Sequence, residues 1–156
     1  CFHNIVLSLR MPLGSCKRKY KTLYNSLSSL SMGIGMGHAW VDIEISDMEK
    51  KKSKVVKALV DTGASLTVLP KKVADELGIK PSGEEMVSTG AGEIKLSRGE
   101  AWIKLDGKTG PFTIWISDIV DKVLLGVVVL ETLGFNVEPK TGKLKPTPLL
   151  LYFLAK

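Results

Sequence analysis

The sequence predicts an all-β domain of short strands and tight hairpins, with one or two short helices around a single core. Apolar and polar residues alternate at period two in several segments, which is typical of strands with one buried face. Glycine is abundant, with 15 in 156 residues, and this favours turns over long helices. A chain of 156 residues, 44% of them apolar, is long enough for one globular core. No apolar stretch reaches the ~18 residues of a membrane span.

Basic charge is concentrated in residues 1–35, which hold five of the 22 Lys and Arg residues and none of the 16 acidic residues. This segment therefore carries +5, whereas residues 36–156 are nearly neutral at +1. We expect a basic, flexible appendage over 1–35 and a single domain over 36–156. A signal peptide, or an arm that binds nucleic acid or an acidic membrane, is the other interpretation of the appendage. Because the domain is neutral, no nucleic-acid partner is expected for it.

Both cysteines, Cys1 and Cys16, lie in the appendage, so the domain is not built on disulfides. Together with His3 and His38 they match no metal-site spacing, and we expect neither a metal nor a cofactor. This cysteine usage is compatible with a reducing cytoplasm, which is the expected compartment, with secretion as the alternative.

The first half of the domain reads as a hairpin, a strand and a helix. Alternation over residues 39–45 and the apolar run Val55–Val60 predict two strands joined by a charged turn. Leu66–Leu69 is expected as a short third strand that ends at a proline. Lys71–Leu77 is expected as one or two helical turns, with Gly78 at the C-cap.

The middle of the domain reads as a second hairpin. Pro81–Glu85 is expected as loop, and Met86–Thr89 and Glu93–Leu96 as strand-like arms around the tip Gly90-Ala91-Gly92. A Gly-x-Gly tip of this kind predicts a mobile hairpin, although it also suits a plain turn. Alternation over residues 101–105 predicts a separate strand after the hairpin.

The last third holds a second apolar run that ends in glycine, Val123–Gly126. A strand over residues 112–116 precedes this run, and a short helix over Val127–Leu133 follows it, closed by Gly134. The final apolar run, residues 149–154, is too short to span a membrane. It suits an added strand in a subunit interface.

The predicted strand Val55–Val60 is followed directly by a carboxylate residue, Asp61. Thr62, Gly63 and Ala64 come next. A carboxylate at the end of a buried strand is costly unless something pairs or uses it. The glycine beside it allows another backbone to approach closely. The alternative is an ordinary strand exit, in which Asp61 hydrogen-bonds its own turn.

The octet Ala58–Ser65 resembles the active-site signature of aspartic proteases: two apolar residues, Asp-Thr-Gly, then Ala-Ser. With the hairpin at Gly90-Ala91-Gly92 and the late element Leu124-Leu125-Gly126, residues 38–144 resemble the retropepsins, the single-lobe family of retroviral proteases and their cellular relatives. The resemblance implies a closed, barrel-like β fold with a flap hairpin over the active site.

The resemblance also implies roles for individual residues. Asp61 would be the catalytic aspartate, Thr62 would brace two active-site loops, and Gly63 would let these loops meet and hold substrate backbone, with Ala64 completing the loop. Residues 90–92 would close over the substrate as the flap. Many retroviral members pair an acidic residue after the motif with an Arg after the late glycine, whereas this chain has Ser65 and Val127. The N-terminal interface strand of those members is not evident either.

The chemistry of this family needs two carboxylates that share one proton, because two like charges in contact resist ionising together. The chain has a single Asp-[Thr/Ser]-Gly, and a two-lobed enzyme would need about twice a ~100–150-residue domain. We therefore expect a C2 homodimer that hydrolyses an extended peptide or protein substrate between two copies of Asp61. By alternation, the apolar candidates to line its cleft are Leu66, Val68, Ile94 and Ile116.

Two other functions fit the same sequence. The first is a catalytically silent module of the same fold that dimerises or binds peptides, because a fold does not guarantee chemistry. The second is a nucleic-acid-associated factor that acts through the basic segment 1–35, which predicts salt-sensitive binding.

Overall fold

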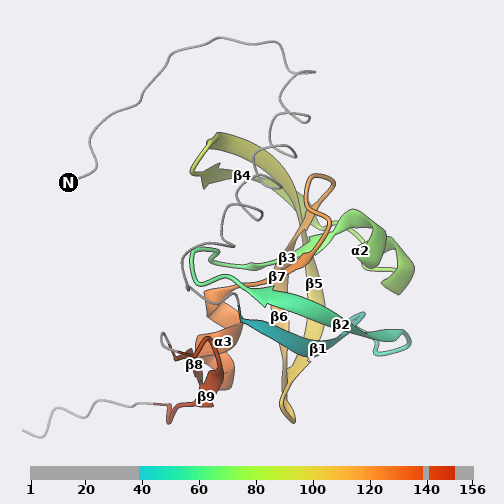
Figure 1. Cartoon of the computed structure of the whole chain (residues 1–156). Coiled ribbons are helices and arrows are strands. Elements are labelled where there is room, and N and C mark those ends of the chain that lie inside the picture. The colour runs from blue at the N-terminus through green and yellow to red at the C-terminus, as the bar shows by residue number, and fades with distance from the viewer. Residues whose placement is uncertain (1–38, 139–140, 150–156) are drawn as a thin grey trace, which may run out of the picture.

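The structure is a computed structural model, and it describes residues 39–138 and 141–149. The expected basic appendage over 1–35 and nearly all of the final apolar run lie outside the described residues. Within the described ranges the chain forms nine strands and two short helices (Figure 1). The all-β expectation with one or two short helices is therefore confirmed.

Six strands form a closed barrel in the order β1-β2-β7-β3-β6-β5, and pairing of β1 with β5 closes the ring. A closed barrel leaves no unpaired edge strand in the ring. The six strands span Trp40–Ser46 (β1), Ser53–Val60 (β2), Thr67–Pro70 (β3), Gly92–Leu105 (β5), Lys108–Ser117 (β6) and Val123–Leu125 (β7).

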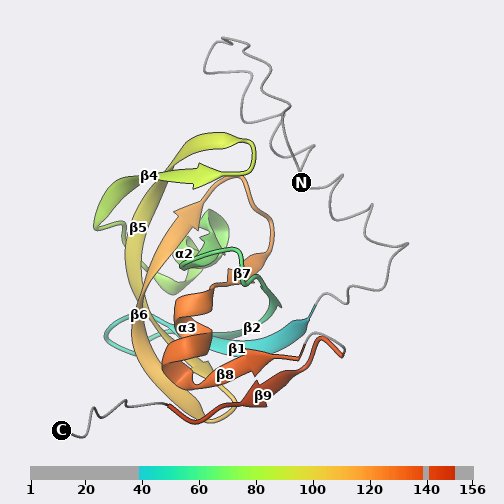
Figure 2. The same ribbon diagram turned by 90° about the vertical axis from the view of Figure 1, so that its left-hand side faces the viewer.

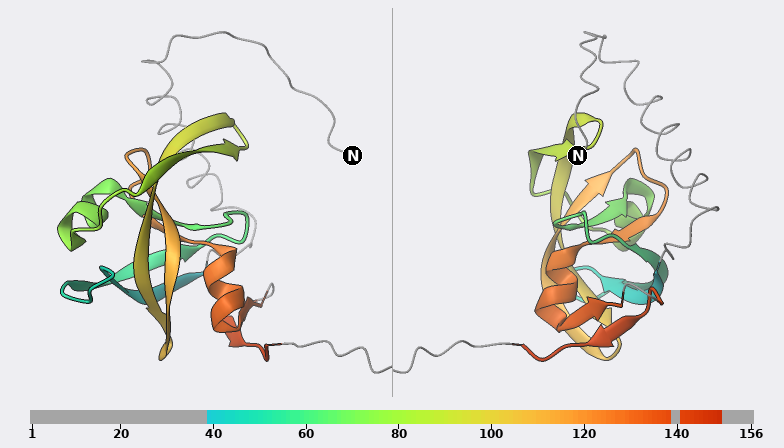
Figure 3. Two further views of the ribbon diagram at one scale, coloured as in Figure 1. Left: turned by 180° about the vertical axis from the view of Figure 1, so that it is seen from behind. Right: turned by 60° about the vertical axis from the view of Figure 1, so that its left-hand side comes forward.

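Two hairpins extend from this barrel at opposite ends (Figure 2). Strand β4, Gly83–Thr89, pairs antiparallel with the first half of β5 and forms the expected flap-like hairpin. Strands β8, Phe135–Val137, and β9, Leu144–Pro146, form a separate two-stranded sheet at the other end. Seen from behind, β5 runs along the barrel and continues into the flap-like hairpin (Figure 3).

Helices α2, Lys71–Leu77, and α3, Val127–Leu133, each follow a barrel strand and end at a glycine in the left-handed conformation. Gly78 has φ 72° and Gly134 has φ 68°, values that L side chains adopt only with strain. Both helices and both C-caps agree with the sequence prediction. Their apolar sides pack into the barrel through Ala74, Leu77 and the buried residues of α3.

The core is built from one face of the barrel strands together with these helices. Ile43 and Ile45 come from β1, Ile103 from β5 and Ile114 from β6, and all four are almost fully buried. Within β1 the two isoleucines are two residues apart, which is the alternation that the sequence showed. Such interiors are close-packed, so the core holds the strand ends from which the loops leave in fixed positions.

Two boundaries differ from the prediction. Gly83–Glu85, expected as loop, belongs to β4, because it pairs with residues 96–98 of β5. Residues 92–105, expected as two strands, form one strand of 14 residues. Gly99 lies inside that strand, where an added Cβ would be 3.1 Å from Ile116 Cδ1, so the glycine marks a close approach and not a break.

Among the described residues, no helix is long and apolar enough to cross a bilayer. In the same ranges, no three His, Cys, Asp or Glu side chains gather closely enough to hold a metal ion.

Candidate active site

The candidate site forms where β2 and β7 end. These two strands are parallel neighbours, and their register pairs Leu59 with Leu124 and Val60 with Leu125. Asp61 and Gly126 are the next residues on each strand, and the Asp61 N–H donates to the Leu125 carbonyl at 3.0 Å. The structure thus brings together two segments that the sequence singled out 65 positions apart.

The Asp61 side chain lies in a tight turn of its own loop. Its Oδ1 accepts the Gly63 N–H at 3.0 Å, and its carbonyl accepts the Ala64 N–H at 3.1 Å. This is the turn contact that an ordinary strand exit would also make. Asp61 is half-buried, whereas Thr62 and Gly63 are exposed, so the outer surface of the loop is open.

A buried hydroxyl joins the two loops behind Asp61. Thr67 is 0% exposed, and its Oγ1 accepts the Gly126 N–H at 3.1 Å. Gly126 has no room for a side chain, because an added Cβ would lie 2.4 Å from the Leu66 carbonyl carbon and 2.7 Å from the Thr67 nitrogen. Sequence reasoning missed Thr67, whose only signal was a hydroxyl residue inside the apolar run Leu66–Leu69.

The first turn of α3 also holds the loop. The Val127 N–H donates to the Ala64 carbonyl at 2.9 Å, and the Val128 N–H donates to the Ser65 carbonyl at 3.2 Å. These bonds satisfy amide groups that a helix start leaves unpaired. Where many retroviral members place an acid–Arg pair, this chain therefore connects loop and helix through the main chain, with Ser65 and Val127 at those positions.

The flap-like hairpin ends in a two-residue tip. Register pairs Thr89 with Gly92, which leaves Gly90 and Ala91 as the tip. Thr89 Oγ1 donates to the Gly92 carbonyl at 2.7 Å and accepts the Ala91 N–H at 3.2 Å. Gly92 has φ 115°, so the turn needs a glycine there, whereas a Cβ at Gly90 would meet nothing within 4 Å. In Figures 1 and 3 this tip and the loop between β2 and β3 lie on the same side of the barrel.

The strands between the loop and the hairpin present a second apolar face. Residues directly opposite each other in a sheet share a face, and the register joins Val68 with Trp115 and Leu124, Trp115 with Arg98, and Leu96 with Glu85. None of the apolar residues on this face belongs to the core cluster. We call it the flap-side face, and its apolar members are Val68, Val87, Ile94, Leu96, Trp115 and Leu124.

The flap-side face revises the expected lining of the cleft. Val68 and Ile94 lie on it and Leu66 is half-buried just before β3, and their place in a substrate cleft stays a prediction. Ile116, however, is buried in the core cluster, so its predicted place in the cleft was wrong. The neighbouring Trp115 points to the opposite side of β6 and belongs to the flap-side face. Alternation of Phe112, Ile114 and Ile116 located the apolar face of the strand but could not tell whether that face packs on the core or lines a cleft.

Comparison with known proteins assigns the chain to a family. A family model described as aspartyl protease matches residues 41–141. The chain belongs to the aspartyl protease family. Among solved structures it is similar to EIAV protease complexed with the inhibitor HBY-793, with 20% identity, a TM-score of 0.53, and coverage of 63% of this chain and 89% of that one.

A second similar structure is the retroviral protease-like domain of Ddi1 from Leishmania major, with 21% identity and a TM-score of 0.50. The match covers 70% of this chain and 87% of that one. No curated protein sequence is significantly similar to this aspartyl protease family member. At these identities the solved structures show the fold alone, and they confirm the retropepsin-type fold. The roles of Asp61, Thr62, Gly63 and the flap stay predictions.

Proposed function

We propose that this chain is an aspartic endopeptidase that hydrolyses peptide bonds between two Asp61 carboxylates, one from each subunit of a homodimer. The observation that carries the proposal is the position of Asp61. In a chain of the aspartyl protease family, it follows β2 directly, lies beside Gly126 and belongs to a loop whose outer residues Thr62 and Gly63 are exposed. These 156 residues hold a single Asp-Thr-Gly, and the proposal is that a second copy of the chain supplies the second carboxylate.

The shape of the loop supports a close approach of two copies. Thr62 and Gly63 are exposed, and the one atom within 4 Å of a Cβ built at Gly63 is Asp61 Oδ1, at 3.2 Å. In the part of the chain that the structure describes, nothing else covers this surface at Gly63. A twofold axis through the loop would place the two Asp61 carboxylates together, with each Thr62 hydroxyl against the loop of the partner.

The pair would act through one shared proton. The ionised carboxylate takes a proton from water while the water oxygen attacks the carbonyl carbon of the peptide bond, and the protonated carboxyl donates its proton to the carbonyl oxygen. The tetrahedral intermediate then collapses. Its C–N bond breaks and the leaving nitrogen receives a proton from the pair. The reaction as proposed needs no covalent enzyme intermediate.

The substrate would be an extended peptide or protein segment held between the flap and the loop. Strand-like peptides bind through main-chain hydrogen bonds, with alternate side chains in pockets. The half-buried apolar side chains of the flap-side face, Val87, Ile94 and Trp115, would contact apolar substrate side chains.

The test is cleavage of an unfolded protein by the full chain as wild type, Asp61→Asn and a matched control, Asp106→Asn. Asp106 is an exposed aspartate in the turn between β5 and β6, far along the chain from the candidate loop. All three proteins are compared at one concentration at which sedimentation shows a dimer. We expect cleavage by wild type and control, and its loss in Asp61→Asn with dimerisation intact.

The pH profile and dilution complete the test. Wild-type activity should fall at both acid and alkaline pH, because the pair must hold one proton, neither two nor none. Specific activity should also fall on dilution through the monomer–dimer transition. Activity that persists in Asp61→Asn, or in demonstrated monomers, would overturn the proposal. A dimer that binds peptides but never cleaves them would favour the silent module.

A further inference from the structure

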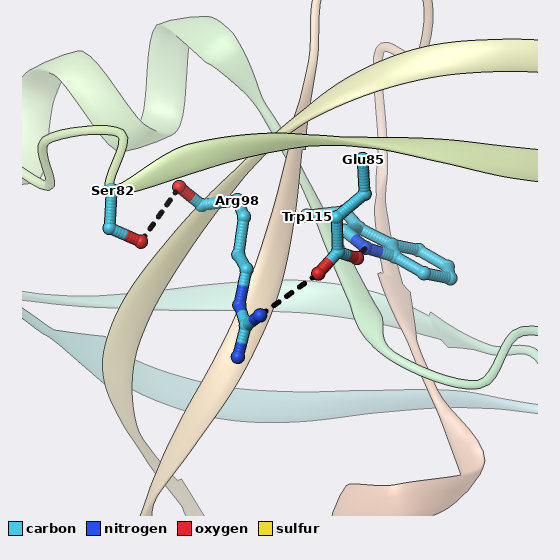
Figure 4. Close-up of polar contacts among 4 residues, drawn as sticks. All are labelled: Ser82, Glu85, Arg98 and Trp115. Atoms are coloured by element: carbon cyan, nitrogen blue, oxygen red, sulfur yellow. Dashed lines mark hydrogen bonds and ion pairs between the residues drawn. The ribbon is translucent and has the colours of Figure 1, made fainter.

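Glu85 joins three neighbouring strands at the base of the flap (Figure 4). Its Oε1 accepts Nη1 of Arg98, in β5, at 3.0 Å, and its Oε2 accepts the indole Nε1–H of Trp115, in β6, at 2.8 Å. In the sheet, β4 is hydrogen-bonded to β5 and not to β6. The bond to Trp115 therefore connects the flap strand to a strand of the barrel that its main chain does not reach.

The main chain is anchored at the same place. The Arg98 carbonyl accepts the Ser82 N–H at 2.7 Å and the Ser82 hydroxyl at 3.3 Å, immediately before β4 begins. Arg98 thus holds the start of β4 through its carbonyl and Glu85 through its guanidinium (Figure 4). Charge-assisted hydrogen bonds of this kind are among the stronger ones in proteins.

Beyond Glu85, the side-chain bonds of Glu84 and Thr89 stay within the hairpin. Met86 is 63% exposed, and the tip bonds of Thr89 remain within the hairpin. Glu84, the neighbour of Glu85, pairs with Lys95 across the hairpin itself. Because successive side chains of a strand point to opposite faces, Glu84 and Glu85 are a matched pair. Both carry an ion pair within the hairpin, but Glu85 also hydrogen-bonds Trp115 of the barrel strand β6.

We propose that Glu85 is a positioning residue. It tethers the base of the flap to the barrel through Trp115 and so fixes the angle at which residues 86–95 close over a bound peptide. This role rests on the proposed protease function. The indole of Trp115 can donate a hydrogen bond but cannot accept one. Removal of the Glu85 carboxylate would leave this N–H without its acceptor and would loosen the base of the flap.

Amide hydrogen exchange of the full-length chain tests the tether without any need for activity. The variants are Glu85→Ala, Glu85→Gln and Trp115→Phe, with Glu84→Gln as the control. We expect exchange over residues 86–95 to accelerate about tenfold in Glu85→Ala and Trp115→Phe, the factor that corresponds to one lost hydrogen bond. Glu85→Gln keeps an acceptor for the indole and should show a smaller increase, and Glu84→Gln none.

Exchange of the core strands should stay at the wild-type level in every variant, which shows that the fold is intact. Unchanged flap exchange in both Glu85→Ala and Trp115→Phe would overturn the tether. So would equal acceleration in Glu84→Gln, because any lost ion pair would then have the same effect.

Steady-state cleavage of a peptide tests the positioning role. A loosened flap holds the peptide less well, so Glu85→Ala should raise KM several-fold with kcat within about twofold of wild type, and Glu85→Gln should recover most of the loss. A merely destabilised protein would instead lose active enzyme and kcat. Faster flap exchange with an unchanged KM would overturn the positioning role. If wild type does not cleave, the proposed function fails, and the exchange result still decides the tether.

Discussion

Replacement of Gly126 by alanine should be among the most damaging single-methyl changes in this domain. The backbone there, with φ −77° and ψ 162°, suits any residue, so conformational strain contributes nothing. The cost is steric, because the added Cβ would lie 2.4 to 2.7 Å from main-chain atoms of Leu66 and Thr67, which no rotamer change can move away. Relief requires the loop to shift, and the shift breaks the buried bond between the Gly126 N–H and Thr67.

These terms give a magnitude. Overpacking of a close-packed site costs about 1–3 kcal/mol. Leaving a buried donor unpaired costs about 1–3 kcal/mol more. Alanine also reduces the conformational entropy of the unfolded chain, which stabilises the folded state by about 0.4–1 kcal/mol. We therefore expect the free energy of unfolding to fall by about 1–6 kcal/mol, a large share of the ~5–15 kcal/mol of a typical domain.

The assay is equilibrium urea unfolding followed by tryptophan fluorescence, at one fixed protein concentration because dimerisation shifts apparent stability. Gly90→Ala is the matched control, since its Cβ would meet nothing within 4 Å, and it should stay within about 0.5 kcal/mol of wild type. A loss below about 1 kcal/mol in Gly126→Ala would refute the steric reasoning.

Three further changes test other parts of the structure. Thr67→Val removes the buried acceptor and should cost about 1–3 kcal/mol in urea unfolding, while Thr67→Ser should recover most of it. Gly78→Ala should cost about 1–2 kcal/mol for its positive φ, and Gly134→Ala more, because its Cβ would also lie 2.7 Å from a carbonyl oxygen; thermal unfolding ranks the two. A hydrogen bond from Lys54, together with its charge, lowers the pKa of Glu76, so the pair stabilises the fold above the usual pKa of glutamate. This contribution disappears as the pH falls through the lowered pKa, and the Tm difference between wild type and Glu76→Gln should shrink on acidification.

The part of the fold that sequence predicts best is the part governed by local rules. Strand β1 shows strict alternation because one face packs on the core, and α2 and α3 end where glycine takes a left-handed conformation. The segments around Asp61 and Gly126 were each recognised as motifs. Their contact was not predictable from pattern, because it depends on parallel pairing of β2 with β7, strands that are distant in the chain.

The errors share a physical cause. Gly83–Glu85 looked like loop because both of its faces carry polar groups, and an acidic side chain that bonds to the barrel is indistinguishable in sequence from a solvated one. Alternation in β6 marks the face of Phe112, Ile114 and Ile116 as apolar, but it does not say whether that face packs on the core or lines a cleft. Three-dimensional contacts decide both cases.

The bond between Thr67 and Gly126 spans 59 residues of chain, and this separation governs when the candidate site comes into being. Contacts between distant segments form late in folding, because the loop that joins them must close first. During synthesis, about 65 residues separate the addition of Asp61 from that of Gly126, or about 3–13 s at ~5–20 residues per second. For that interval the nascent chain carries the aspartate without the glycine loop that positions it, and no enzyme geometry exists. Because the two halves of the candidate site lie on distant strands, the site is assembled only when the barrel that joins them is complete.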